Sequence, residues 1–67
     1  MSENTLRTIR EKKGISQLQL SYKTGISQTA ISNIENGRVY PYPGWRKRIA
    51  KALNVPEKEI FMNEQEG

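Results

Sequence analysis

The chain has 67 residues, which leaves room for one domain with one small hydrophobic core. It contains no cysteine and no histidine, and its acidic residues are all glutamates, so disulfides, thiol chemistry and the usual transition-metal ligand sets are not available. This composition argues against an enzyme and implies no cofactor, metal or small-molecule ligand. No apolar run approaches the roughly 20 residues of a membrane span, and the polar N-terminus lacks a signal-peptide pattern, so we expect a cytoplasmic protein.

The net charge of +4 is distributed unevenly along the chain. Residues 1–55 carry ten Lys or Arg and three Glu, a balance of +7, whereas residues 56–67 carry one Lys and four Glu, a balance of −3. A basic body suits a polyanionic partner such as nucleic acid, although many small basic proteins bind none.

Serine and glycine residues divide the first half of the chain into three short expected helices. Two serines are candidate N-caps: Ser16, with Gln19 at capping-box spacing, and Ser27, which opens a helix expected to run to Asn36. Glycines that can close each helix in a left-handed conformation follow at the expected ends: Gly14, Gly25 and Gly37.

The second half begins with residues 39–44, which we expect to be non-helical throughout because Pro41 and Pro43 lack a backbone donor and constrain the residue before them. Apolar residues from Trp45 to Leu53 recur at helical spacing and predict an amphipathic helix with a basic outer face. Pro56 fits the first turn of a last short helix. The expected core is Leu6, Ile9, Ile15, Leu20, Ile26, Ile31, Ile34, Trp45, Ile49, Leu53, Val55 and Phe61.

The expected helix over residues 27–36 has one apolar and one polar face. At about 100° per residue, its apolar side chains share one arc, and the opposite arc holds only amides and hydroxyls: Gln28, Thr29, Ser32, Asn33 and Asn36. Amides can pair bidentately with adenine in the major groove, and a threonine methyl can contact the methyl of thymine. The alternative is an ordinary solvated face.

A short turn containing Gly25 joins this helix to the one before it, which is the spacing of a helix-turn-helix. In that motif the first helix crosses the phosphate backbone and the second enters the groove. Gln17, at the start of the first helix, is then expected near a phosphate, unless it simply extends into water.

Several segments together resemble the Cro and phage-repressor (Xre) helix-turn-helix family over about residues 5–61: 15–17, 22–28, 31–37 and 49–55. The resemblance implies an all-α, five-helix, lambda-repressor-like domain at 5–61 with its motif at 17–36, followed by a short acidic tail at 62–67. It implies a nucleoid-associated transcriptional regulator, a repressor more often than an activator, that binds operator DNA as a homodimer. The implied base-reading residues are Gln28, Thr29, Ser32 and Asn33. The implied phosphate contacts include Gln17, Asn36, Arg38 and the start of the fourth helix. Arg10 and Glu35 match positions of a buried structural ion pair.

The segment from Tyr40 to Arg46 departs from the family pattern, because Trp45 and Arg46 stand where leucines are common. We expect Arg38, Tyr40, Arg46 and Lys47 to clamp phosphate beside the reading helix. Alternatively, Tyr40 and Tyr42 only cover the core while the arginines are solvated.

Two points stay open from the sequence. The fold also serves as a protein-interaction module, such as an antitoxin or adaptor, which would bind DNA neither tightly nor selectively. A single such domain covers one half-site, so a dimer on a pseudo-palindromic operator is expected. Its subunit interface is expected among Val55, Pro56, Lys58 and Phe61.

Overall fold

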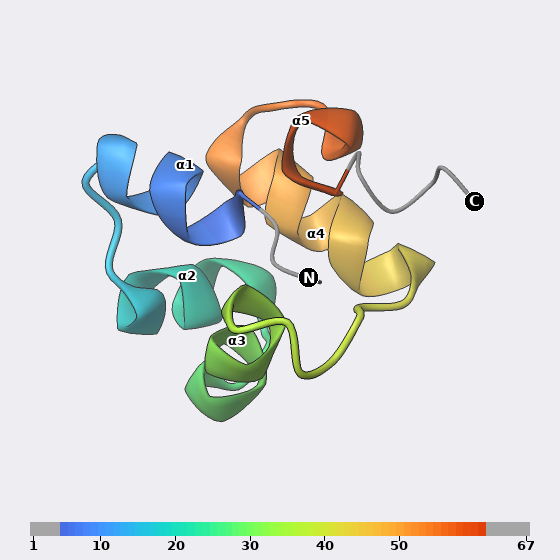
Figure 1. Ribbon diagram of the computed structural model, residues 1–67. Coiled ribbons are helices and arrows are strands. Elements are labelled where there is room, and N and C mark those ends of the chain that lie inside the picture. Colours follow the sequence, from blue (N-terminus) through green and yellow to red (C-terminus); the bar gives the residue numbers. More distant parts are fainter. Residues whose placement is uncertain (1–4, 62–67) are drawn as a thin grey trace.

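Five helices account for most of the described chain (Figure 1). The computed structural model describes residues 5–61, and within that range there is no strand, which confirms the all-α prediction. The acidic tail predicted at 62–67 lies outside the described residues. No helix in the described range is long and apolar enough to cross a membrane. The helices are α1 Leu6–Lys12, α2 Gln17–Thr24, α3 Gln28–Glu35, α4 Pro43–Leu53 and α5 Glu57–Phe61.

The predicted caps define α2 and α3. Ser16 Oγ accepts from the Gln19 amide at 3.0 Å and the Ser16 amide donates to Gln19 Oε1 at 2.8 Å, a complete capping box. Ser27 Oγ accepts from the Ala30 amide at 3.1 Å. Between the two helices Gly25 has φ 76°, a left-handed conformation that lets α2 stop and α3 leave in a new direction.

The turn between α2 and α3 is fixed from within the fold. Buried Thr24 donates from Oγ1 to the Leu20 carbonyl at 2.8 Å and accepts from the Ile26 amide at 3.2 Å. Arg48, on α4, donates from Nη1 to the Thr24 carbonyl at 3.3 Å. The angle between the two helices of the motif is therefore held by α4 as well as by the turn itself.

The core lies where α2, α3, α4 and α5 meet, and α1 packs against α5. Two of the buried hydrophobic residues of the core, Ala50 and Ile60, are absent from the predicted core. The predicted core members Ile9, Ile15, Trp45 and Val55 are only partly buried and pack at its edge. The buried hydrophobic residues are Leu6, Leu20, Ile26, Ile31, Ile34, Ile49, Ala50, Leu53, Ile60 and Phe61.

The start of α4 differs from the prediction. Residues 39–42 are non-helical as expected, but Pro43 and Gly44 belong to the helix. Pro43 occupies the first helical position, where an amide would have no partner within the helix and the fixed φ of proline is already helical. Tyr42 is extended, and its carbonyl accepts the first helical bonds, from the amides of Trp45 at 2.9 Å and Arg46 at 3.0 Å.

Candidate nucleic-acid interface

The outer face of α3 carries the four predicted base-reading residues. Ile31 and Ile34 turn into the core and Ser27 caps the helix, so the opposite side faces outward. Gln28 and Thr29 are exposed, and Ser32 and Asn33 are half-buried. In Figure 1 this helix lies at one end of the molecule, away from α5.

A shallow hollow of about 360 Å³ lies between the start of α2, the outer face of α3 and the residues that follow α3. It brings together all four predicted base-reading residues with two predicted phosphate contacts, which come from outside α3. Its lining is Gln17, Gln28, Thr29, Ser32, Asn33 and Arg38. The hollow is walled by amide and hydroxyl groups with one cation at its edge, a set that can pair with base edges and one phosphate.

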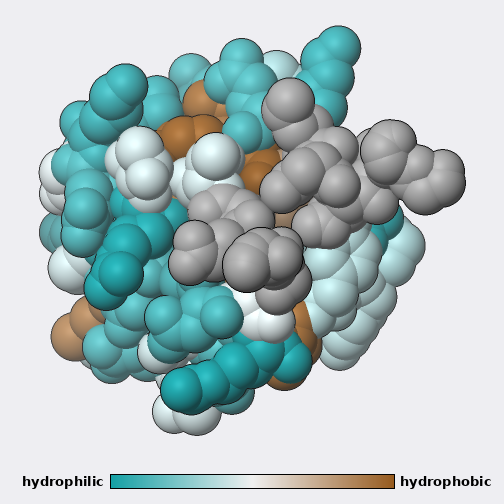
Figure 2. Space-filling view, in the orientation of Figure 1, coloured by the Kyte–Doolittle hydropathy of each residue, from teal (hydrophilic) through white to brown (hydrophobic). Residues whose placement is uncertain are grey.

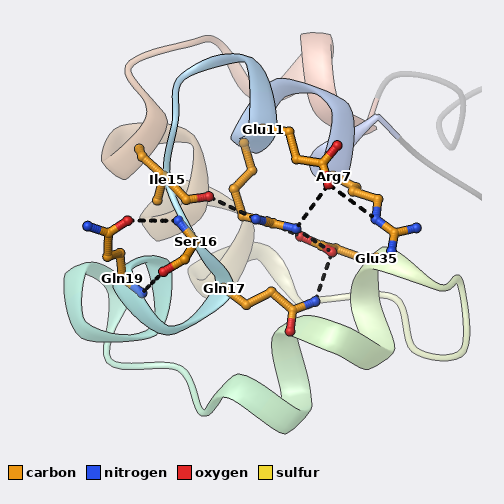
Figure 3. Close-up of polar contacts among 8 residues, drawn as sticks. Arg7, Glu11, Ile15, Ser16, Gln17, Gln19 and Glu35 are labelled. Atoms are coloured by element: carbon orange, nitrogen blue, oxygen red, sulfur yellow. Dashed lines mark hydrogen bonds and ion pairs between the residues drawn. The ribbon is translucent and has the colours of Figure 1, made fainter.

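Gln17 is not simply extended into water. Its Nε2 donates to Glu35 Oε1 at 3.0 Å, and the side chain is half-buried (Figure 3). This bond fixes the amide at the hollow and ties the start of α2 to the end of α3. No local sequence pattern predicts this bond, because the two residues are 18 positions apart.

Arg10 and Glu35 form a buried pair between α1 and α3. Arg10 Nε donates to Glu35 Oε2 at 2.6 Å and Nη2 donates to Oε1 at 3.2 Å, with side chains 8% and 2% exposed. Arg10 Nη1 also donates to the Ile15 carbonyl at 2.8 Å. The hydrogen bond to Glu35 raises the pKa of Arg10 against the opposing effect of burial, and the negative charges of Glu35 and Glu11 add to the rise. Both groups serve the fold and are not available to a ligand.

The remaining predicted phosphate contacts fall into two groups. Asn36, Arg38 and Lys47 are exposed, and the Arg38 amide donates to the Asn33 carbonyl at 2.9 Å, which places Arg38 directly after α3. Tyr40, also exposed, and half-buried Arg46 contact each other: the Arg46 guanidinium carbon lies 5.1 Å from the centre of the Tyr40 ring, and Arg46 Nη1 donates to the Pro41 carbonyl at 2.8 Å.

Hydrophilic side chains predominate on the face shown in Figure 2, and hydrophobic ones appear there in small separate areas.

Two aromatic side chains beside the start of α4 form a contact that the sequence did not predict. Tyr42 stacks on Trp45, with ring centroids 4.9 Å apart and planes 23° apart. A spacing of three residues can bring two side chains together at a helix start. The sequence predicts a non-helical segment that includes Pro43, which lies between them, so it does not predict this contact.

The chain matches the family model described as a helix-turn-helix domain over residues 4–66. It is 42% identical over 57 residues to the HTH-type transcriptional repressor RghR of Bacillus subtilis (strain 168), covering 84% of this chain and 42% of that protein. It is 37% identical over 57 residues to Repressor protein C of Rhizobium phage 16-3, covering 85% of this chain and 21% of that protein. The chain thus spans less than half the length of either relative.

The fold resembles the crystal structure of the restriction-modification controller protein C.AhdI from Aeromonas hydrophila, with a TM-score of 0.77 and 28% identity, covering 81% of this chain and 82% of that one. The resemblance to Cro and phage-repressor proteins is confirmed by these matches. This chain belongs to the helix-turn-helix domain family.

Proposed function

We propose that this chain is a sequence-specific DNA-binding transcriptional regulator that reads operator DNA in the major groove with α3. The observation that carries the proposal is the hollow, in which the second helix of a helix-turn-helix presents Gln28, Thr29, Ser32 and Asn33 together. Two similar proteins are named as repressors, which favours repression over activation.

Base reading follows from the chemistry of these four side chains. The amides of Gln28 and Asn33 each offer a donor and an acceptor, the pair that adenine presents in the major groove. The Thr29 methyl can pack against a thymine methyl, and the Ser32 hydroxyl can donate or accept. A groove about 12 Å wide admits a helix such as α3, which has only its polar face outward.

Phosphate contacts are assigned to exposed or hollow-lining polar groups at the start of α2, after α3 and on α4. These are Gln17, Asn36, Arg38 and Lys47. Gln17 stands at the start of α2, where free amides favour an anion. Arg38 borders the hollow as its one cation, so it is placed to neutralise a phosphate that flanks the bases read by α3.

The regulator acts as a homodimer, because one helix-turn-helix covers a single half-site. Pro56 and Lys58 are exposed at the α4–α5 end and can meet a second copy, while Val55 is half-buried and Phe61 is buried. A protein of this activity works in the cytoplasm, on the nucleoid, and needs no enzymatic step.

Selection of bound duplexes from a random pool at near-physiological salt tests the proposal. We expect the chain to enrich a two-fold-symmetric motif, and the Gln28→Ala, Asn33→Ala variant to lose it. Thr8→Ala, a polar truncation on the exposed face of α1, is the control and keeps the motif. If only salt-sensitive, unselective binding is recovered, the chain is a protein-interaction module, with the fold kept and DNA reading absent.

A further inference from the structure

Arg46 differs from its basic neighbours on α4 in what surrounds it. Lys47 and Arg48 are exposed, whereas the Arg46 side chain is only 22% exposed. Its guanidinium has three partners: it donates to the Pro41 carbonyl at 2.8 Å, lies 3.6 Å from Glu57 Oε1 on α5, and covers one face of the Tyr40 ring. Arg46 is therefore surrounded by Tyr40, Pro41 and Glu57.

Tyr40 is fixed on a second side. Its ring meets Phe61 of α5 edge to face, with centroids 6.2 Å apart and planes 86° apart. Pro41, the next residue, is buried. The connection from α3 to α4 is therefore attached to α4 through Arg46 and to α5 through Phe61, a few residues after Arg38 at the hollow.

The same contacts make Arg46 a poor phosphate ligand. The guanidinium already donates to a carbonyl and faces a carboxylate, which offsets its positive charge, and the Glu57 charge would repel an approaching phosphate. A planar guanidinium that lies over an aromatic ring while donating to a fixed carbonyl is an arrangement that lysine does not reproduce.

We propose that Arg46 and Tyr40 are positioning residues for DNA binding: they hold residues 38–42 so that Arg38 stays at the edge of the hollow, and they do not themselves contact phosphate. The inference rests on the proposed function, in which Arg38 contacts the DNA backbone.

The test compares Arg46→Lys with Arg46→Gln for operator affinity over a range of salt concentrations. A phosphate contact depends on charge, so Lys would retain most of the affinity and Gln would lower the log–log salt slope by about 0.9. A positioning role depends on the guanidinium itself, so both variants bind about fivefold or more weakly, and both lower the slope alike because Arg38 leaves its phosphate. Affinity and slope retained in Arg46→Lys, with both lowered only in Arg46→Gln, overturn the proposal.

Tyr40 supplies a matched pair of variants. Tyr40→Phe keeps the ring that Arg46 covers and removes the hydroxyl, while Tyr40→Leu removes the ring. Positioning predicts that Leu weakens binding more than Phe does. Equal losses in the two variants would assign the effect to the hydroxyl and contradict the proposal.

A readout without DNA separates this inference from the proposed function. The Arg38 amide donates to the Asn33 carbonyl, so its hydrogen exchange reports whether the connection stays in place. We expect faster exchange at Arg38 in Arg46→Lys while the Leu20 and Ile31 amides are unchanged. Unchanged exchange at Arg38 overturns positioning; a wild-type chain that selects no DNA sequence overturns the function alone.

Discussion

Glu35 accepts hydrogen bonds from Arg10 on α1 and from Gln17 on α2, so one buried carboxylate joins three helices. Replacing it with alanine leaves the buried Arg10 guanidinium with only the exposed Glu11 carboxylate, 4.0 Å away, as a countercharge. We expect Glu35→Ala to lower the free energy of unfolding by roughly 3 kcal/mol, the cost of breaking a buried pair from one side. Urea unfolding at pH 7 measures this.

The direction of the Arg10 pKa shift makes pH 7 suitable for this measurement. Since the pKa of Arg10 is raised in the folded state, its contribution is fully present below the ordinary arginine value and is lost only as pH rises through the raised one. The control is Arg7→Ala, which removes an exposed pair with Glu11 at 3.8 Å and should cost under about 1 kcal/mol. An unchanged urea midpoint for Glu35→Ala would show that the pair does not stabilise the fold.

Replacing Gly25 and Gly44 with alanine should have opposite effects on the stability of the fold. Gly25 has φ 76°, and an added Cβ would make only an ordinary 3.7 Å contact with Arg48 Nη1, so the cost is the left-handed backbone, about 1–2 kcal/mol. Gly44 lies in the first turn of α4 with nothing within 4 Å of an added Cβ, so Gly44→Ala should stabilise by about 0.4–1 kcal/mol. Thermal unfolding of both variants checks the signs; destabilisation by Gly44→Ala would mean that this glycine is needed for its conformation.

The helices of the motif could be predicted because their signals are local. Ser16, Gln19 and Ser27 cap through bonds that span three residues, and Gly25 ends α2 by its own backbone conformation. The polar outer face of α3 could likewise be predicted, since helical periodicity alone separates it from Ile31 and Ile34; that this face reads bases stays a prediction.

The features that sequence reasoning missed depend on contacts between distant residues or on one helix boundary. Proline marks the first turn of a helix as readily as a loop, so Pro43 alone did not decide where α4 begins. Ile60 is buried by the way that α5 folds back on α4. The surroundings of Arg46 come from Tyr40 and Glu57, and no spacing rule relates those three residues.

Arg38 is expected to neutralise one phosphate. Arg38→Gln should reduce the slope of log affinity against log salt by about 0.9 while leaving the selected sequence the same. Lys58→Gln, the same loss of one charge on α5 at the other end of the molecule, is the control and should leave the slope unchanged (Figure 1). Binding isotherms on the selected duplex at several salt concentrations measure both. Equal slope changes in the two variants would mean that only net charge matters.

The proposed homodimer predicts that operator affinity depends on the phase of the two half-sites. Two copies of α3 enter successive major grooves on one side of the duplex when half-site centres are roughly 34 Å apart. Inserting about five base pairs between the half-sites turns one of them to the opposite side, so we expect affinity to fall to that of a single half-site. Changing the identity of the central base pairs at constant length is the control and keeps both half-sites in phase. Gel-shift titration of the three duplexes measures the effect; an insertion that leaves affinity unchanged would show that each copy binds alone and that no dimer forms on DNA.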